Sequence, residues 1–152
     1  MPKCRKELIE ALGASEQADC FDNKTVAKEK KKEFRIENKS HKTICRVQVD
    51  GCLIDDRSTK RCDFLFKICE TERYVLVELK GSNVEDAFPQ LINTHRYLRE
   101  KLNITTEQCE AVIVSTRVPS AANRKVQQLK KQCLDKHKLP VRIDNRRASY
   151  PV

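Results

Sequence analysis

Four segments in the middle of the chain have the spacing of apolar residues that is expected of β-strands. They are residues 43–49, 61–66, 74–81 and 110–115. Short polar loops join the first three, so we expect them to form an antiparallel meander. The fourth follows a helical pattern, and a strand reached through a helix should lie parallel to the preceding one by a right-handed crossover. The pattern therefore predicts an α/β fold with a mixed central sheet flanked by helices.

The clearest helical pattern follows the third strand. Ser82 or Asn83 can cap a helix that runs to about Leu102, with an apolar stripe on one face. Pro89 lies inside this span and should either kink the helix or delay its start. We also predict helices at residues 3–12, at 24–32 and from Pro119 onward, strands at 34–37 and 141–143, and extended chain at 52–54. Residues 34–37 alternatively end the helix before them.

Length and composition indicate one domain, residues 1–152. The chain is long enough for a single core, and 39% hydrophobic residues with only 3 glycines favour a compact fold. We place the core at about residues 24–118, with the helix 3–12 before it and a basic helix and strand, 120–145, after it. The N-terminus lacks an apolar signal-like segment and no run of 18 apolar residues occurs, which predicts no membrane span and a cytoplasmic location.

Eight cysteines invite a disulfide or zinc interpretation. They stand at positions 4, 20, 45, 52, 62, 69, 109 and 133. No two of them are separated by the two or four residues of a typical zinc-binding pair. Several lie inside apolar runs, as Cys45, Cys62 and Cys109 do. We therefore interpret the cysteines as small buried thiols of a cytosolic protein.

The charge is strongly positive and unevenly distributed. The formal net charge is +9, with +5 in residues 24–42 and +7 in 120–152, while residues 43–119 are nearly neutral. A polyanion such as nucleic acid suits basic segments on either side of a neutral centre, although a solubilising surface explains the same layout. Candidate nucleic-acid contacts on the last helix are Arg124, Lys125, Lys130 and Lys131.

Candidate chemistry lies on the second and third strands. Alternation places Glu78 and Lys80 on one face of residues 74–81, and Asp63 can lie beside them if residues 64–74 form a hairpin. Charges within an apolar strand are costly to bury unpaired. Two carboxylates and a lysine at a strand end can bind a hard divalent cation and stabilise charge on a phosphate.

Asp63 followed by Glu78-Leu79-Lys80 resembles the PD-(D/E)xK nuclease superfamily, which has the restriction-endonuclease-like fold. The resemblance covers roughly residues 43–117, with Cys62 in the place of the nominal proline. It implies an αβββαβ core in which Asp63, Glu78 and the backbone carbonyl of Leu79 bind Mg²⁺ or Mn²⁺. Lys80 would position or deprotonate the attacking water, or neutralise the transition state.

Further site residues follow from the same resemblance. The helix before the first core strand often lends a carboxylate to the metal, which makes Glu33 and Glu37 accessory candidates. Gln90, on the helix after the third strand, is expected to touch substrate or to orient Lys80. The resemblance thus implies a metal-dependent nuclease, and we expect it to act on DNA rather than RNA. Because a chain of 152 residues leaves little protein for sequence readout, we predict a homodimer or a partner that supplies specificity.

Other interpretations stay open. Glu78 and Lys80 could be an ion pair on a half-exposed strand, and the domain could be a catalytically inactive nucleic-acid-binding or protein-interaction module. Asp55 and Asp56 are rival metal ligands, although Asp63 is preferred because the strand paired with Glu78 carries it. The three histidines are predicted to lie on the surface, at positions 41, 95 and 137.

Overall fold

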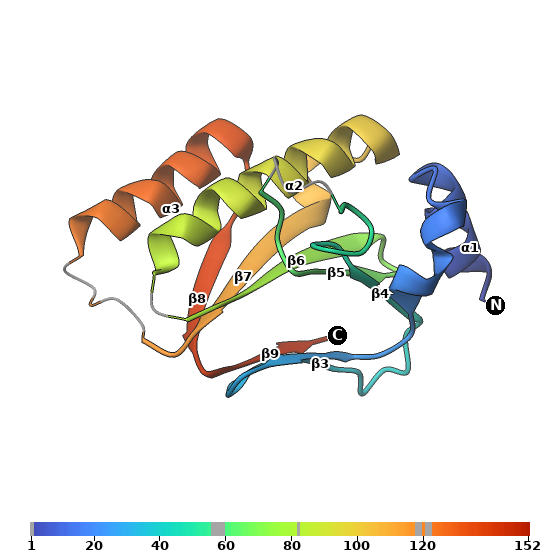
Figure 1. Cartoon of the computed structure of the whole chain (residues 1–152), viewed down its shortest axis with the longest axis horizontal. Coiled ribbons are helices and arrows are strands. Elements are labelled where there is room, and N and C mark those ends of the chain that lie inside the picture. Colours follow the sequence, from blue (N-terminus) through green and yellow to red (C-terminus); the bar gives the residue numbers. More distant parts are fainter. Residues whose placement is uncertain (1, 56–59, 82, 118–119, 121–122) are drawn as a thin grey trace.

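A computed structural model describes residues 2–55, 60–81, 83–117, 120 and 123–152 (Figure 1). The chain forms three layers, with a large sheet in the middle. Helices α2 (Ala87–Leu102) and α3 (Arg124–His137) cover one face of this sheet, and a small sheet covers the other. Helix α1 (Lys3–Ala11) lies at one end on the helical side (Figure 1).

The large sheet has six strands in the order β1-β4-β5-β6-β7-β8. Their bounds are Phe21–Asp22 for β1, Ile44–Gln48 for β4, Phe64–Ile68 for β5, Arg73–Lys80 for β6, Cys109–Ser115 for β7 and Val141–Asn145 for β8. Strands β4, β5 and β6 pair antiparallel, whereas β6, β7 and β8 pair parallel. The predicted meander, the parallel fourth strand and the last strand are therefore confirmed.

Proline sets the start of α2. A single turn of 3-10 helix, η2 (Val84–Asp86), precedes α2, which begins at Ala87 and has Pro89 in its first turn. A first-turn residue needs no N–H for the helix, so the ring is tolerated there. Pro89 thus delays the helix rather than kinking it. The helix ends at Asn103, whose φ of 52° is left-handed.

The remaining helices are short or basic. Helix α3 begins at Arg124, where the Asn123 side chain accepts a hydrogen bond from the Val126 N–H. Pro119 and Ala122, in the predicted start, lie outside the described residues. Two more 3-10 turns are η1 (Ser15–Cys20) and η3 (Thr106–Gln108). None of the helices that the structure describes is long and apolar enough to cross a membrane.

The prediction of a helix at residues 24–32 is wrong. Strand β2 (Val26–Glu29) and strand β3 (Lys32–Glu37) form an antiparallel hairpin there, and β9 (Arg147–Pro151) pairs parallel with β3 to complete the small sheet. The strand predicted at 34–37 is confirmed and extended. The reason is the period of the buried residues: Phe34 and Ile36 alternate with exposed positions and pack against the large sheet.

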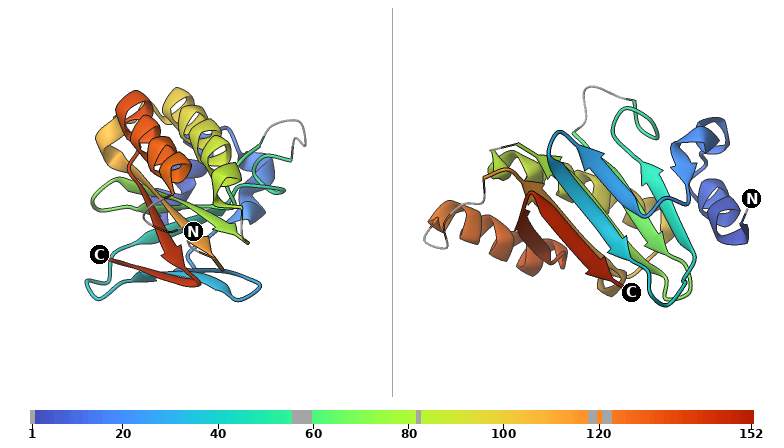
Figure 2. Two further views of the ribbon diagram at one scale, coloured as in Figure 1. Left: turned by 90° about the vertical axis from the view of Figure 1, so that its left-hand side faces the viewer. Right: turned by 90° about the horizontal axis from the view of Figure 1, so that it is seen from below.

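Two hydrophobic clusters hold the layers together. One lies between the large sheet and the helices and includes Leu76, Phe88 and Leu91. The other lies between the two sheets and includes Phe34 and Val77. Figure 2, in its right-hand view, shows the small sheet lying across the large one. Residues 52–54, predicted to be extended, instead form a turn that ends in an isolated bridge.

The cysteines divide into two sets. Cys45, Cys62, Cys109 and Cys133 are free and buried, as predicted. The other four form the disulfides Cys4–Cys69 and Cys20–Cys52, so their prediction as thiols is wrong. Each disulfide joins an N-terminal segment to a turn of the large sheet, a pairing that sequence spacing cannot reveal. Disulfides are typical of oxidising compartments, and the cytoplasmic location stays a prediction.

Candidate active site

Asp63 and Glu78 face each other across two paired strands. Phe64 pairs with Val77, so the preceding residue, Asp63, lies opposite Glu78. The Asp63 N–H donates to Glu78 Oε1 at 3.0 Å, and the Leu79 N–H donates to Asp63 Oδ2 at 2.9 Å. Glu78 is only 2% exposed. The two carboxyl groups predicted to bind a metal are thus brought together and held by main-chain donors.

Burial changes the protonation of this pair. Burial, together with the charge of Asp63, raises the pKa of Glu78 to about 9. Burial also raises the pKa of Asp63, with smaller contributions in the same direction from the charges of Glu29 and Asp50. Two adjacent carboxylates in a poorly solvated site repel each other. The pair therefore favours either a retained proton or a bound cation at neutral pH.

Lys80 completes the predicted trio on the same face of β6. Its Nζ lies 4.0 Å from Glu78 Oε2 and donates to Gln90 Oε1 at 3.2 Å. The side chain is 25% exposed, so its ammonium can reach solvent. Glu78 and Lys80 share one face of β6, as alternation predicted, and the contact with Gln90 shows that this face points toward α2. Two roles were expected for Gln90, and this hydrogen bond fits the one in which Gln90 orients Lys80.

Helix α2 also positions the segment that delivers Asp63. The Cys62 N–H donates to the buried Thr94 Oγ1 at 2.9 Å. Gln90 Nε2 donates to the Arg61 carbonyl at 3.4 Å, and Asn93 Nδ2 donates to the Lys60 carbonyl at 3.1 Å. Three consecutive residues before Asp63 are therefore fixed along one helix face. Sequence reasoning selected Gln90 for its relation to Lys80, but it did not predict that α2 holds this segment.

The structure does not bring the other acidic candidates to the pair. Glu33 lies on the outer face of β3, where Lys28 and Arg35 bind it at 3.2 Å and 3.4 Å. Glu37 is exposed at the far end of the same strand. The resemblance made both residues candidates because a helix was expected before the first core strand, and strand β3 takes its place. Among the rival ligands, Asp55 is exposed and Asp56 lies outside the described residues.

The histidines and the basic helix have mixed outcomes. His41 is exposed and His137 is half-buried, but His95 is 1% exposed, so its predicted surface position is wrong. Burial lowers the pKa of His95 to about 4. On α3, Arg124, Lys125 and Lys131 are exposed and Lys130 is partly buried. Lys125 pairs with Glu85 at 3.5 Å.

The pair fits a hard cation by its donor chemistry. Two carboxylates supply the oxygen ligands that Mg²⁺ and Mn²⁺ prefer, and their mutual repulsion is relieved by a positive charge between them. In the described part of the chain, no group of three or more histidine, cysteine, aspartate or glutamate side chains could hold a metal. A cation here would thus need backbone and water ligands in addition.

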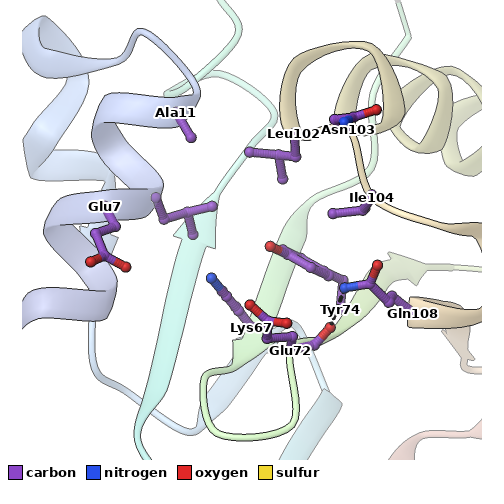
Figure 3. Close-up of a pocket in the computed structure, with 10 residues that line it drawn as sticks. Glu7, Ala11, Lys67, Glu72, Tyr74, Leu102, Asn103, Ile104 and Gln108 are labelled. Carbon is purple, nitrogen blue, oxygen red and sulfur yellow. Dashed lines mark hydrogen bonds between the residues drawn. The ribbon is translucent and has the colours of Figure 1, made fainter.

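A separate cavity lies at the other end of β6. It has a volume of about 310 Å³, and Tyr74, near the first residue of that strand, contributes to its wall with Lys67 (Figure 3). Figure 3 also shows Gln108 bonded to the Glu72 carbonyl, at 2.9 Å. Tyr74 and Lys80 are six positions apart along the strand, about 20 Å. This cavity is therefore distinct from the carboxylate pair.

Comparison of the chain with protein-family models, curated proteins and solved structures finds no match.

Proposed function

We propose that this protein is a metal-dependent nuclease. Its active site, formed by Asp63, Glu78 and Lys80, would hydrolyse phosphodiester bonds. One observation carries the proposal: the buried carboxyl group of Glu78 lies opposite the partly buried carboxyl group of Asp63, with the Lys80 ammonium 4.0 Å from Glu78. Burial of a like-charged pair opposes folding, so its presence on a central strand favours a function that uses the pair.

Asp63 and Glu78 would hold Mg²⁺ or Mn²⁺, with the Leu79 carbonyl as a third protein ligand. A bound cation of this kind lowers the pKa of coordinated water and offsets charge that develops on a phosphate. The protein's own groups fix the geometry, since main-chain N–H groups orient both carboxylates and α2 holds the segment before Asp63. Such orientation by neighbouring donors tunes a metal ligand.

Lys80 would act on the phosphate or on the attacking water. An ammonium has three donors, of which one is used on Gln90. The remaining donors are available to a phosphate oxygen, where they would stabilise negative charge as the water oxygen bonds to phosphorus and the bond to the leaving oxygen breaks. Gln90 keeps the ammonium near Glu78 without neutralising it.

We propose DNA as the substrate, because basic residues lie on α3 and on the β2–β3 hairpin, which cover opposite faces of the large sheet that carries Glu78. Backbone phosphates bind such surfaces without sequence preference. A chain of 152 residues leaves little surface for sequence readout. A second copy or another protein would then supply specificity.

The test is cleavage of linear, circular and single-stranded DNA and of RNA, with Mg²⁺, Mn²⁺ or EDTA. Wild type is expected to cut with metal and not in EDTA, while Glu78→Gln and Lys80→Gln abolish cutting. Matched controls are Glu100→Gln and Lys101→Gln, because both residues are exposed at the end of α2. Cleavage that persists in the two site variants contradicts the assignment, and binding without cleavage under any metal favours the inactive binding module.

A further inference from the structure

The β2–β3 hairpin turns through two lysines in an unfavourable backbone conformation. Glu29 pairs with Lys32, so Lys30 and Lys31 alone form the loop, with φ of 37° and 59°. Two-residue loops with positive φ at both positions strongly prefer Asn-Gly, because other side chains clash with the backbone there. Strain kept at a particular site points to a role for the residues that cause it.

The same hairpin borders a basic hollow. Its volume is about 390 Å³, and its walls come from residues 28–33 and from Arg147 of β9. Lys32 is 7% exposed, and none of the carboxylates that the structure describes lies within 4.0 Å of its ammonium. Glu33, in contrast, is already bound to Lys28 and Arg35. The hollow therefore has a net positive charge, because five basic side chains line it against two carboxylates, Glu29 and Glu33.

The hairpin lies near the end of β6 that carries Lys80. The Arg146 carbonyl accepts from the Glu33 N–H, and the Arg146 N–H donates to the Ser115 carbonyl, both at 2.8 Å. Ser115 in turn pairs with Lys80. Figure 1 shows the turn between β8 and β9 beside this hairpin, below the end of β6.

We propose that residues 28–32, which we call the lysine hairpin, bind the phosphate backbone of nucleic acid beside the Asp63–Glu78 pair. The inference rests on the proposed function, since it places the substrate strand across the end of the sheet at which Lys80 lies. Lysines bind phosphates as mobile point charges, and two of them at an exposed tip can follow a backbone without reading its bases. The unfavourable turn is kept because Asn-Gly would lack these charges.

The test separates stability from binding in one variant, K30N/K31G. Relief of the turn should raise the thermal midpoint by about 3 °C or more. Loss of two phosphate contacts should weaken binding of a labelled 20-base-pair duplex about ten-fold or more at 0.1 M salt. It should also lower the slope of log affinity against log salt by about 2. Binding is measured in EDTA, so that cleavage plays no part.

Two controls isolate the hairpin. K30R/K31R keeps the charge and should keep wild-type affinity. K6Q/K39Q removes the same charge from two exposed lysines, one on α1 and one beyond the opposite end of β3, and should change binding much less. A more stable K30N/K31G protein with wild-type affinity overturns the proposal, as does a wild type that binds no duplex.

The two proposals can fail separately. Metal-dependent cleavage by wild type with unchanged duplex affinity in K30N/K31G would support the nuclease proposal and contradict the phosphate-binding role of the hairpin. Duplex binding that is lost in K30N/K31G, with no cleavage by wild type under any metal, would support the phosphate-binding role of the hairpin and contradict the nuclease proposal.

Discussion

Replacing Glu78 by glutamine should make the metal-free protein more stable at alkaline pH. The folded-state pKa of Glu78 is about 9, against 4.5 for an ordinary glutamate. Between these values the folded protein holds a proton that the unfolded chain has released. Stability therefore falls as pH rises through this range. Glutamine carries no such proton, but its oxygen can still accept the Asp63 N–H.

The magnitude follows from the shift. Each pH unit between the two pKa values is worth about 1.4 kcal/mol, so the wild type loses up to about 5 kcal/mol relative to Glu78→Gln between pH 4.5 and pH 8. Near pH 4.5 the two proteins should be about equally stable. The assay is urea unfolding in EDTA at a series of pH values, with Glu100→Gln as the exposed control.

Mg²⁺ gives the same experiment a second readout. A cation that binds the ionised pair should stabilise wild type at pH 8 but leave Glu78→Gln unchanged, because binding to the folded state alone raises its stability. Parallel pH curves for wild type and Glu78→Gln in EDTA would refute the raised pKa of Glu78 in the folded protein. Equal stabilisation of both proteins by Mg²⁺ would refute the placement of the cation.

Three further outcomes follow from other parts of the fold. Thr94→Val should destabilise the protein by about 1–3 kcal/mol, because the buried Cys62 N–H loses its acceptor, and it should also reduce cleavage. Thr94→Ser keeps the hydroxyl and should change neither stability nor cleavage. A buried histidine with a pKa of about 4 lowers the free energy of unfolding by up to about 3 kcal/mol as pH falls from 6.5 to 4, and His95→Leu should abolish this loss. Unfolding of both proteins at pH 7.5 and pH 5 measures the difference. Reduction of the two disulfides should lower stability by about 4 kcal/mol for each, given sequence separations of 65 and 32, as unfolding with and without reductant would measure.

The arrangement of the site could be predicted where strand geometry alone decides it. Alternation along β6 fixed which face carries Glu78 and Lys80, and a short connection between two apolar runs placed Asp63 opposite Glu78. Both inferences depend on neighbours in sequence and on the period of a strand. Pro89 likewise marked the start of α2 through its own backbone chemistry.

What could not be predicted depends on contacts between distant segments or on strained backbone. The lysine hairpin has no turn residues, so its basic sequence resembled a solvated helix. β9 pairs with β3 across more than a hundred residues, and the contact of Thr94 with Cys62 joins a helix to a loop. His95 is buried although its neighbours in sequence are polar, because α2 has a wider buried face than its apolar stripe indicates.

The most direct test of the central claim is a Mn²⁺ titration followed by electron paramagnetic resonance at pH 8. We predict one bound Mn²⁺ per wild-type chain, which is lost in Asp63→Asn and in Glu78→Gln. Lys80→Gln and Glu100→Gln should retain it, because neither residue is proposed as a ligand. Mn²⁺ binding that is unchanged in both carboxylate variants, or absent from wild type, would contradict the assignment of Asp63 and Glu78 as the metal site.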